Sequence, residues 1–198
     1  MSRKKILLDV DEVICFSGFL DAVNEFLGTS YLIDDFTDYY IDEVAIPKGQ
    51  FEEFKRFASA RNNYENPDFL PGAIETIEQL NEYYDLFICS SCVNPFYPLE
   101  SGDVFKNKFN FLVEYLPFIN PENFIFTSSK QLIKGDIIID DSISHLSSDI
   151  EIKILFPSYH NRDISDRELE EKNIIRGGRD WRNGWEEVKR ILLDENML

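Results

Sequence analysis

Short apolar runs alternate with stretches of helical periodicity over most of the chain, and this rhythm predicts the fold. The runs are rich in branched and aromatic side chains, as expected of buried strands. They span residues 5–10, 85–89, 123–127, 136–140 and 151–156. Strands that alternate with helices are typical of a parallel sheet covered on both faces. We therefore predict an α/β fold with a three-layer, Rossmann-like parallel sheet.

Helical spacing fills the intervals between these runs. The pattern predicts helices over residues 73–84, 103–115 and 185–194. The insertion after the first strand also has helical spacing at 21–28 and 50–64, around an acidic, aromatic stretch that the pattern does not assign. We expect a small helical cap formed by 16–66, inserted after the first strand into a core formed by 1–15 and 67–198. Trp181 and Trp185 fit either packing of the terminal helix or an interface.

Aspartates follow two of the predicted strands. Asp9 and Asp11 end the first strand and point the same way, while Asp140 and Asp141 end the fourth. Ligands of parallel sheets bind at the carboxyl ends of the strands. Like charges this close repel unless a cation bridges them or one carboxylate holds a proton. Carboxylates suit Mg²⁺, but a polar strand exit at Asp9 or a helix N-cap at Asp141 is the simpler alternative.

Two further segments offer groups that could hold a phosphate. The second strand ends in Cys89-Ser90-Ser91-Cys92, where hydroxyls and free backbone N–H groups can bind phosphoryl oxygens. A redox or metal-binding cysteine pair is the alternative at this position. Lys130 follows the third strand and could supply a positive charge, although a lone loop lysine is usually only solvated.

The charge balance limits the partners. The 198 residues suffice for one well-buried domain, and 20 basic against 37 acidic residues give a net charge of −17. Such a field repels nucleic-acid polymers, and a small phosphorylated ligand would need a metal or a few lysines to enter. No apolar stretch is long enough for a membrane span. The three cysteines are an odd number, which argues against a disulfide framework and fits a reducing cytoplasm.

The four elements at successive strand ends resemble the haloacid dehalogenase superfamily of phosphohydrolases. They are DVDEV, Ser90, Lys130 and IIIDD, in that order. The blocks EYLPFINPENFIFTSSKQLIKGDIIIDDS, SYHN and WRNGWEEV are similar to the 5′(3′)-deoxyribonucleotidase family.

The resemblance implies a role for each of these residues. It makes Asp9 the nucleophile and Asp11 the general acid/base. Phosphate binding would fall to Ser90, with Ser91 beside it, and to Lys130. The implied cofactor is Mg²⁺, and its ligands would be Asp9, Asp11 through the backbone carbonyl, Asp141 and, in support, Asp140.

The resemblance also implies a substrate, a (deoxy)nucleoside monophosphate, whose base could stack on the cap aromatics Phe16, Phe19 and Tyr39. Those rings could equally form the cap's own core. Glu12 stands where the superfamily often has a small glycine. Three alternatives stay open: a phosphatase for another small phosphorylated metabolite, a non-catalytic nucleotide-binding module, and a thiol oxidoreductase.

Overall fold

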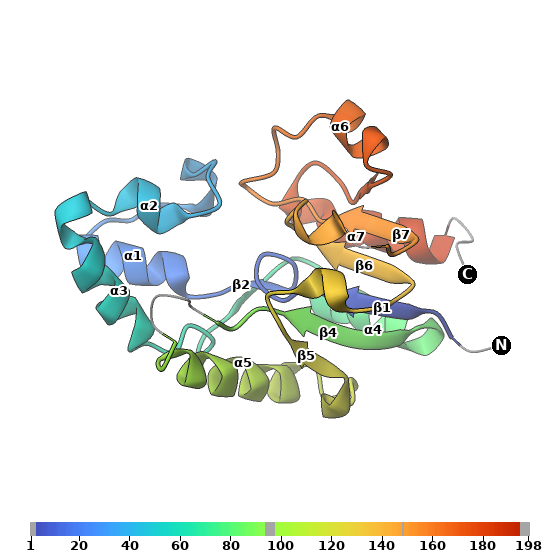
Figure 1. The fold of residues 1–198 in the computed structure, drawn as a ribbon, viewed down its shortest axis with the longest axis horizontal. Helices are drawn as coiled ribbons and strands as arrows, with labels where there is room; N and C mark the ends of the chain where they lie inside the picture. Colours follow the sequence, from blue (N-terminus) through green and yellow to red (C-terminus); the bar gives the residue numbers. More distant parts are fainter. Residues whose placement is uncertain (1–2, 94–97, 148, 195–198) are drawn as a thin grey trace.

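The computed structural model describes residues 3–93, 98–147 and 149–194, and its centre is a six-stranded parallel sheet (Figure 1). The strand order is β5-β4-β1-β6-β7-β8. The strands are β1 (Lys5–Leu8), β4 (Asp85–Ser90), β5 (Phe124–Phe126), β6 (Ile137–Asp140), β7 (Ile152–Leu155) and β8 (Ile175–Arg176). The predicted α/β parallel sheet is confirmed.

The strand β1 lies at the centre of the sheet, between β4 and β6. Leu8 is in register with Ile88 on one side and with Ile139 on the other. The register continues past the strand, because the Asp9 N–H donates to the carbonyl of Ile139 at 3.1 Å. The residues that follow these three strands therefore meet at one edge of the sheet, where ligands of parallel sheets bind.

Apolar side chains cover both faces of the sheet. Alternation along β1 sends Ile6 and Leu8 to one face and Leu7 to the other. The first face packs against α4 (Ala73–Tyr83), α5 (Ser101–Tyr115) and α7 (Gly184–Lys189). The opposite face is covered by short turns and by α6 (Asp166–Glu171). Trp185 is fully buried in the first layer and donates its indole N–H to the carbonyl of Val13 at 2.7 Å.

Three helices form a separate group beyond the carboxyl ends of the strands (Figure 1). They are α1 (Phe19–Leu27), α2 (Ile41–Ala45) and α3 (Phe51–Ser59), and they enclose an apolar cluster of their own. Two chain segments connect this group to the sheet, and they pair as the antiparallel strands β2 (Cys15–Phe16) and β3 (Asp68–Phe69). We refer below to these helices and the segments between them, residues 17–67, as the cap.

Several elements depart from the sequence pattern. The strands β2, β3 and β8 have two residues each, too few for any periodicity to show. The helix α6 contains a single buried apolar residue, Leu169, so the pattern does not reveal it either. The predicted terminal helix is α-helical only as α7 and continues as a π-helical turn over Arg190–Asp194. No helix within the described parts of the chain is both long and apolar enough to cross a membrane.

Candidate active site

Asp9 follows the last residue of the central strand, β1. Its side chain is buried, and Oδ1 accepts a hydrogen bond from the Val10 N–H at 2.8 Å. Burial alone would raise the pKa of Asp9, but the positive charges of Lys130 and Lys108 outweigh it and hold the pKa below its usual range. Asp9 is therefore a carboxylate at neutral pH, as a nucleophile must be.

Lys130 lies between the carboxylates of two adjacent strands. Its Nζ is 2.9 Å from Oδ2 of Asp9 and 2.6 Å from Oδ2 of Asp140, and its side chain is 1% exposed. Burial disfavours the ammonium, but the two carboxylates outweigh this and raise the pKa of Lys130 above its usual range. The loop lysine is thus a buried cation that joins the ends of β1 and β6.

A second buried lysine, Lys108 of α5, was not predicted from the sequence. Its Nζ donates to Oδ2 of Asp11 at 2.6 Å, to Oγ of Ser90 at 2.9 Å and to the carbonyl of Ser91 at 2.6 Å. Its side chain is 1% exposed. Asp11 also accepts a hydrogen bond from the Tyr64 hydroxyl at 2.6 Å. The ammonium of Lys108 therefore connects the Asp11 carboxylate to the end of β4.

The helical pattern contained a signal for Lys108. The buried positions of α5 are Ser101, Lys108, Phe111 and Leu112, which recur at helical spacing on one face. Lys108 precedes Phe111 by three residues and Leu112 by four, so it lies on the buried face of the helix. Lysine is almost never fully buried unless it is paired, so this position already pointed to an internal carboxylate partner.

Ser90 and Ser91 occupy different environments. Ser90 is fully buried at the last position of β4, and its hydroxyl contributes to the low pKa of Asp9. The Ser91 hydroxyl is 2.7 Å from the hydroxyl of Ser128. Cys89 and Cys92 flank them as free, buried thiols, and burial raises the pKa of each to about 11. Thiolates, the reactive form, are scarce at neutral pH.

Asp141, at the end of β6, belongs to a second acidic group with Glu12 and His160. Its Oδ2 is 2.6 Å from Nε2 of His160, which lies 3.6 Å from Oε2 of Glu12. Burial and the neighbouring carboxylates raise the pKa of Asp141 well above its usual range, in spite of the hydrogen bond from His160. Burial disfavours the imidazolium of His160, but its contacts with Asp141 and Glu12 outweigh this and raise the pKa of His160 to about 9, so it supplies a positive charge beside the two carboxylates.

The carboxylates at the strand ends fall into two potential ligand groups. Asp9 and Asp140 group with His145, and Asp141 groups with Glu12 and His160; within each group the candidate ligand atoms lie within 4.8 Å of one another. The two groups meet at adjacent strand ends, and the charge of Asp9 contributes to the raised pKa of Asp141. Carboxylate oxygens that converge in this way are ligands that suit Mg²⁺.

Glu12 adopts a backbone conformation that favours glycine. Its φ is 61°, in the left-handed region that costs a residue with a side chain roughly 1–2 kcal/mol. The side chain of Glu12 has two partners here. The Tyr159 hydroxyl donates to Oε1 of Glu12 at 3.3 Å, and Nε2 of His160 lies 3.6 Å from Oε2. These contacts tie the turn after Asp11 to the loop that follows β7 (Ile152–Leu155).

Two cavities adjoin the residues at the strand ends, and Tyr39 and Tyr40 of the cap line both. One has a volume of about 310 Å³ and contains Asp11, Ser91 and Lys108. The other, of about 330 Å³, contains Asp141, His145 and His160. Phe19 lines the first cavity but also packs edge to face on Phe54 in the cap's own cluster, with ring centroids 5.7 Å apart. The tyrosine Tyr39 is half exposed, with its ring against His160.

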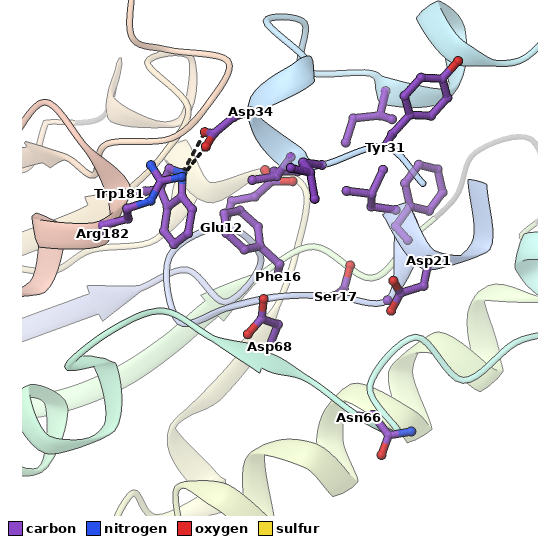
Figure 2. A pocket seen from close by; sticks show the side chains of 16 residues that line it. Glu12, Phe16, Ser17, Asp21, Tyr31, Asp34, Asn66, Asp68, Trp181 and Arg182 are labelled. Atoms are coloured by element: carbon purple, nitrogen blue, oxygen red, sulfur yellow. Dashed lines mark hydrogen bonds and ion pairs between the residues drawn. The ribbon is translucent and has the colours of Figure 1, made fainter. Parts of the chain in front are cut away.

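A third cavity, of about 390 Å³, is lined in part by the strands that lead into the cap (Figure 2). Phe16 faces this cavity and packs against Trp181, and it is not among the described residues that line the cavity of Asp11 and Lys108. The carboxylates of Asp21 and Asp68 also line it, together with Arg182, whose guanidinium is paired with Asp34. Figure 2 shows Asp34 of the cap bonded to Trp181 and Arg182 of the core.

This parallel sheet, with a helical insertion after its first strand, is a haloacid dehalogenase-like fold. A haloacid dehalogenase-like family hydrolase from Streptococcus pneumoniae has this fold, with a TM-score of 0.54 and 17% identity, over 89% of this chain and 95% of the other.

The family follows from the sequence comparisons. The model of the "5' nucleotidase, deoxy (Pyrimidine), cytosolic type C protein" family matches residues 3–174, and the chain belongs to that family. A 5'(3')-deoxyribonucleotidase of Bacillus subtilis (strain 168) is 28% identical over 200 residues, 96% of this chain and 99% of the relative. One of Bacillus phage SPbeta matches to the same extent. The predicted resemblance is confirmed, and the chain is an enzyme of the phosphatase class.

Proposed function

We propose that this protein is a Mg²⁺-dependent phosphatase that hydrolyses (deoxy)nucleoside monophosphates through an aspartyl-phosphate on Asp9. The observation that carries the proposal is the state of Asp9, a buried carboxylate kept ionised by Lys130 and Lys108 at the central strand end. The family and the names of the relatives support the nucleotide as substrate.

The first half of the reaction uses Asp9 and Asp11. An oxygen of Asp9 forms a bond to phosphorus while the bond from phosphorus to the nucleoside oxygen breaks, and Asp11 gives a proton to the leaving oxygen. Lys108 is within hydrogen-bond distance of Asp11, Ser90 and Ser91, so a phosphoryl group that enters here meets a fixed ammonium. Preorganised charge of this kind stabilises the transition state.

The second half regenerates the enzyme. Asp11 takes a proton from water, the water oxygen bonds to phosphorus, and the bond to Asp9 breaks to release inorganic phosphate. The Tyr64 hydroxyl and Lys108 hold the two oxygens of Asp11 at 2.6 Å each, which fixes the carboxylate for both proton transfers.

A magnesium ion would be held by the carboxylates of Asp9 and Asp141 and the backbone carbonyl of Asp11, with Asp140 in support. When bound, it would offset negative charge on the phosphoryl oxygens. Asp140 already accepts hydrogen bonds from Lys130 and from the Ser142 N–H. It is therefore better placed to orient the residues around the ion than to bind the ion directly.

A substrate panel tests this function. Hydrolysis of dUMP, dTMP and dGMP would be compared with that of a sugar phosphate, each with Mg²⁺ and with EDTA, and with the Asp9→Asn variant as the negative control. We expect metal-dependent turnover with a preference for the nucleotides. A clear preference for the sugar phosphate would assign the enzyme to another phosphorylated metabolite, and no turnover of any phosphomonoester would contradict the catalytic proposal.

A further inference from the structure

Two charged residues of the cap lie in the wall of the cavity that contains Asp11 and Lys108. Asp42 belongs to α2 and Lys55 to α3, and their side chains form an ion pair across the two helices. The side chain of Asp42 is 3% exposed and that of Lys55 is 18% exposed. The proposed chemistry uses neither residue.

An ion pair at this depth is a poor way to stabilise a small helical cap. Removing two charges from water is costly, and apolar residues of similar volume often serve stability as well or better. The pair also leaves hydrogen-bonding capacity unused. The ion pair is made through Oδ2 of Asp42, a buried atom that makes no hydrogen bond of good geometry within the described chain. The described partners of Lys55 are this carboxylate and the ring of Phe51, 4.8 Å from its Nζ, although an ammonium has three N–H donors.

The ion pair lies on the cap side of the cavity, where the leaving part of the substrate, the nucleoside, would extend. Lys108 and Ser91 lie in the core wall of the cavity and would hold the phosphate, so the rest of a bound molecule must extend toward the cap. Within the described lining, Lys55 and Lys108 are the two lysines of this cavity, and Lys55 is the one that the cap contributes. A donor beside an acceptor complements a base edge that carries an acceptor beside an N–H donor.

On the basis of the proposed function, we infer that Lys55 and Asp42 determine specificity by binding the hydrogen-bonding edge of the substrate's base. Lys55 donates to an oxygen or nitrogen acceptor of the base, and Asp42 accepts from the adjacent N–H. A sugar phosphate offers no such edge, and the pair then stays buried without a ligand. Selection for nucleotides would thus come from the cap, while the core binds any phosphomonoester.

The test compares dUMP with 2-deoxyribose 5-phosphate, which has the same sugar and phosphate but no base. The measured quantity is the ratio of the two kcat/KM values. Loss of hydrogen bonds to a charged group predicts that Lys55→Met lowers this ratio roughly 10- to 100-fold. The matched control is Lys48→Met, which removes an exposed lysine of the same cap and should leave the ratio unchanged.

A double variant guards against misfolding, because Lys55→Met alone leaves Asp42 buried without its partner. Lys55→Met with Asp42→Leu replaces the whole pair by apolar side chains, and circular dichroism would verify its fold. We expect the ratio to fall in this variant as well. A wild-type ratio in the folded double variant would overturn the inference and leave the pair a structural link. Failure of the proposed function would instead appear in the wild-type enzyme, as no turnover of dUMP.

Discussion

Replacement of Lys108 by methionine tests the cation that was not predicted from the sequence. Methionine retains most of the side-chain volume but removes the ammonium that contacts Asp11, Ser90 and the carbonyl of Ser91. A unit charge about 4 Å from a charged phosphoryl oxygen, at an effective dielectric constant of about 20, contributes ~4 kcal/mol, equivalent to roughly 10³-fold in rate. Because Asp11 shares the ammonium, we expect a loss of about 10²-fold in kcat/KM, the range for removal of one oxyanion donor.

The same change should have a smaller effect on stability. Removal of one partner of a fully buried ion pair costs about 3–5 kcal/mol. The side chain of Asp11 is 34% exposed and keeps its hydrogen bond from Tyr64, so water can solvate the carboxylate that Lys108 leaves. We therefore expect a loss of only ~1–2 kcal/mol in the free energy of unfolding.

Steady-state kinetics with dUMP and with an aryl phosphate, together with urea denaturation, would measure both effects. Lys106→Met is the matched control, because Lys106 is an exposed lysine of the same helix. We expect Lys108→Met to lose activity on both substrates and to bind inorganic phosphate more weakly as a competitive inhibitor. Activity within about threefold of wild type in a folded Lys108→Met protein would refute the role in phosphate binding.

Three further predictions follow from the same geometry. Asp9→Asn should abolish turnover of an aryl phosphate while the circular dichroism spectrum is retained, and near-normal activity would show that the nucleophile is wrong. Asp34→Asn should lower the free energy of unfolding by ~0.5–1 kcal/mol at pH 7, because Asp34 and Arg182 are both about half exposed. The hydrogen bond from Arg182 lowers the pKa of Asp34, so this difference, measured by urea denaturation, should disappear as the pH falls below about 4. Burial raises the pKa of Cys89 and Cys92 to about 11, so alkylation at pH 7.5 should be slow until urea unfolds the chain. Fast labelling of the native protein would instead favour a reactive thiol pair.

The sequence by itself determined the sheet and the residues at its central strand ends. Apolar runs long enough to show a pattern became β1, β4, β5, β6 and β7, and the aspartates and serines that follow them lie at one edge. This information is local, because each strand is a continuous run of residues and parallel strands place their carboxyl ends together.

Tertiary structure decided which charges became partners. Lys108 reaches Asp11 from 97 residues away, and Asp42 meets Lys55 because α2 and α3 contribute to the same apolar cluster of the cap. The separation of Phe16 from the cavity of Asp11 likewise depends on β2 and β3, two-residue strands with no pattern of their own. Periodicity reports which face of an element is buried, but the partner of a buried charge is set by packing between distant segments, and this packing leaves no local trace in the chain.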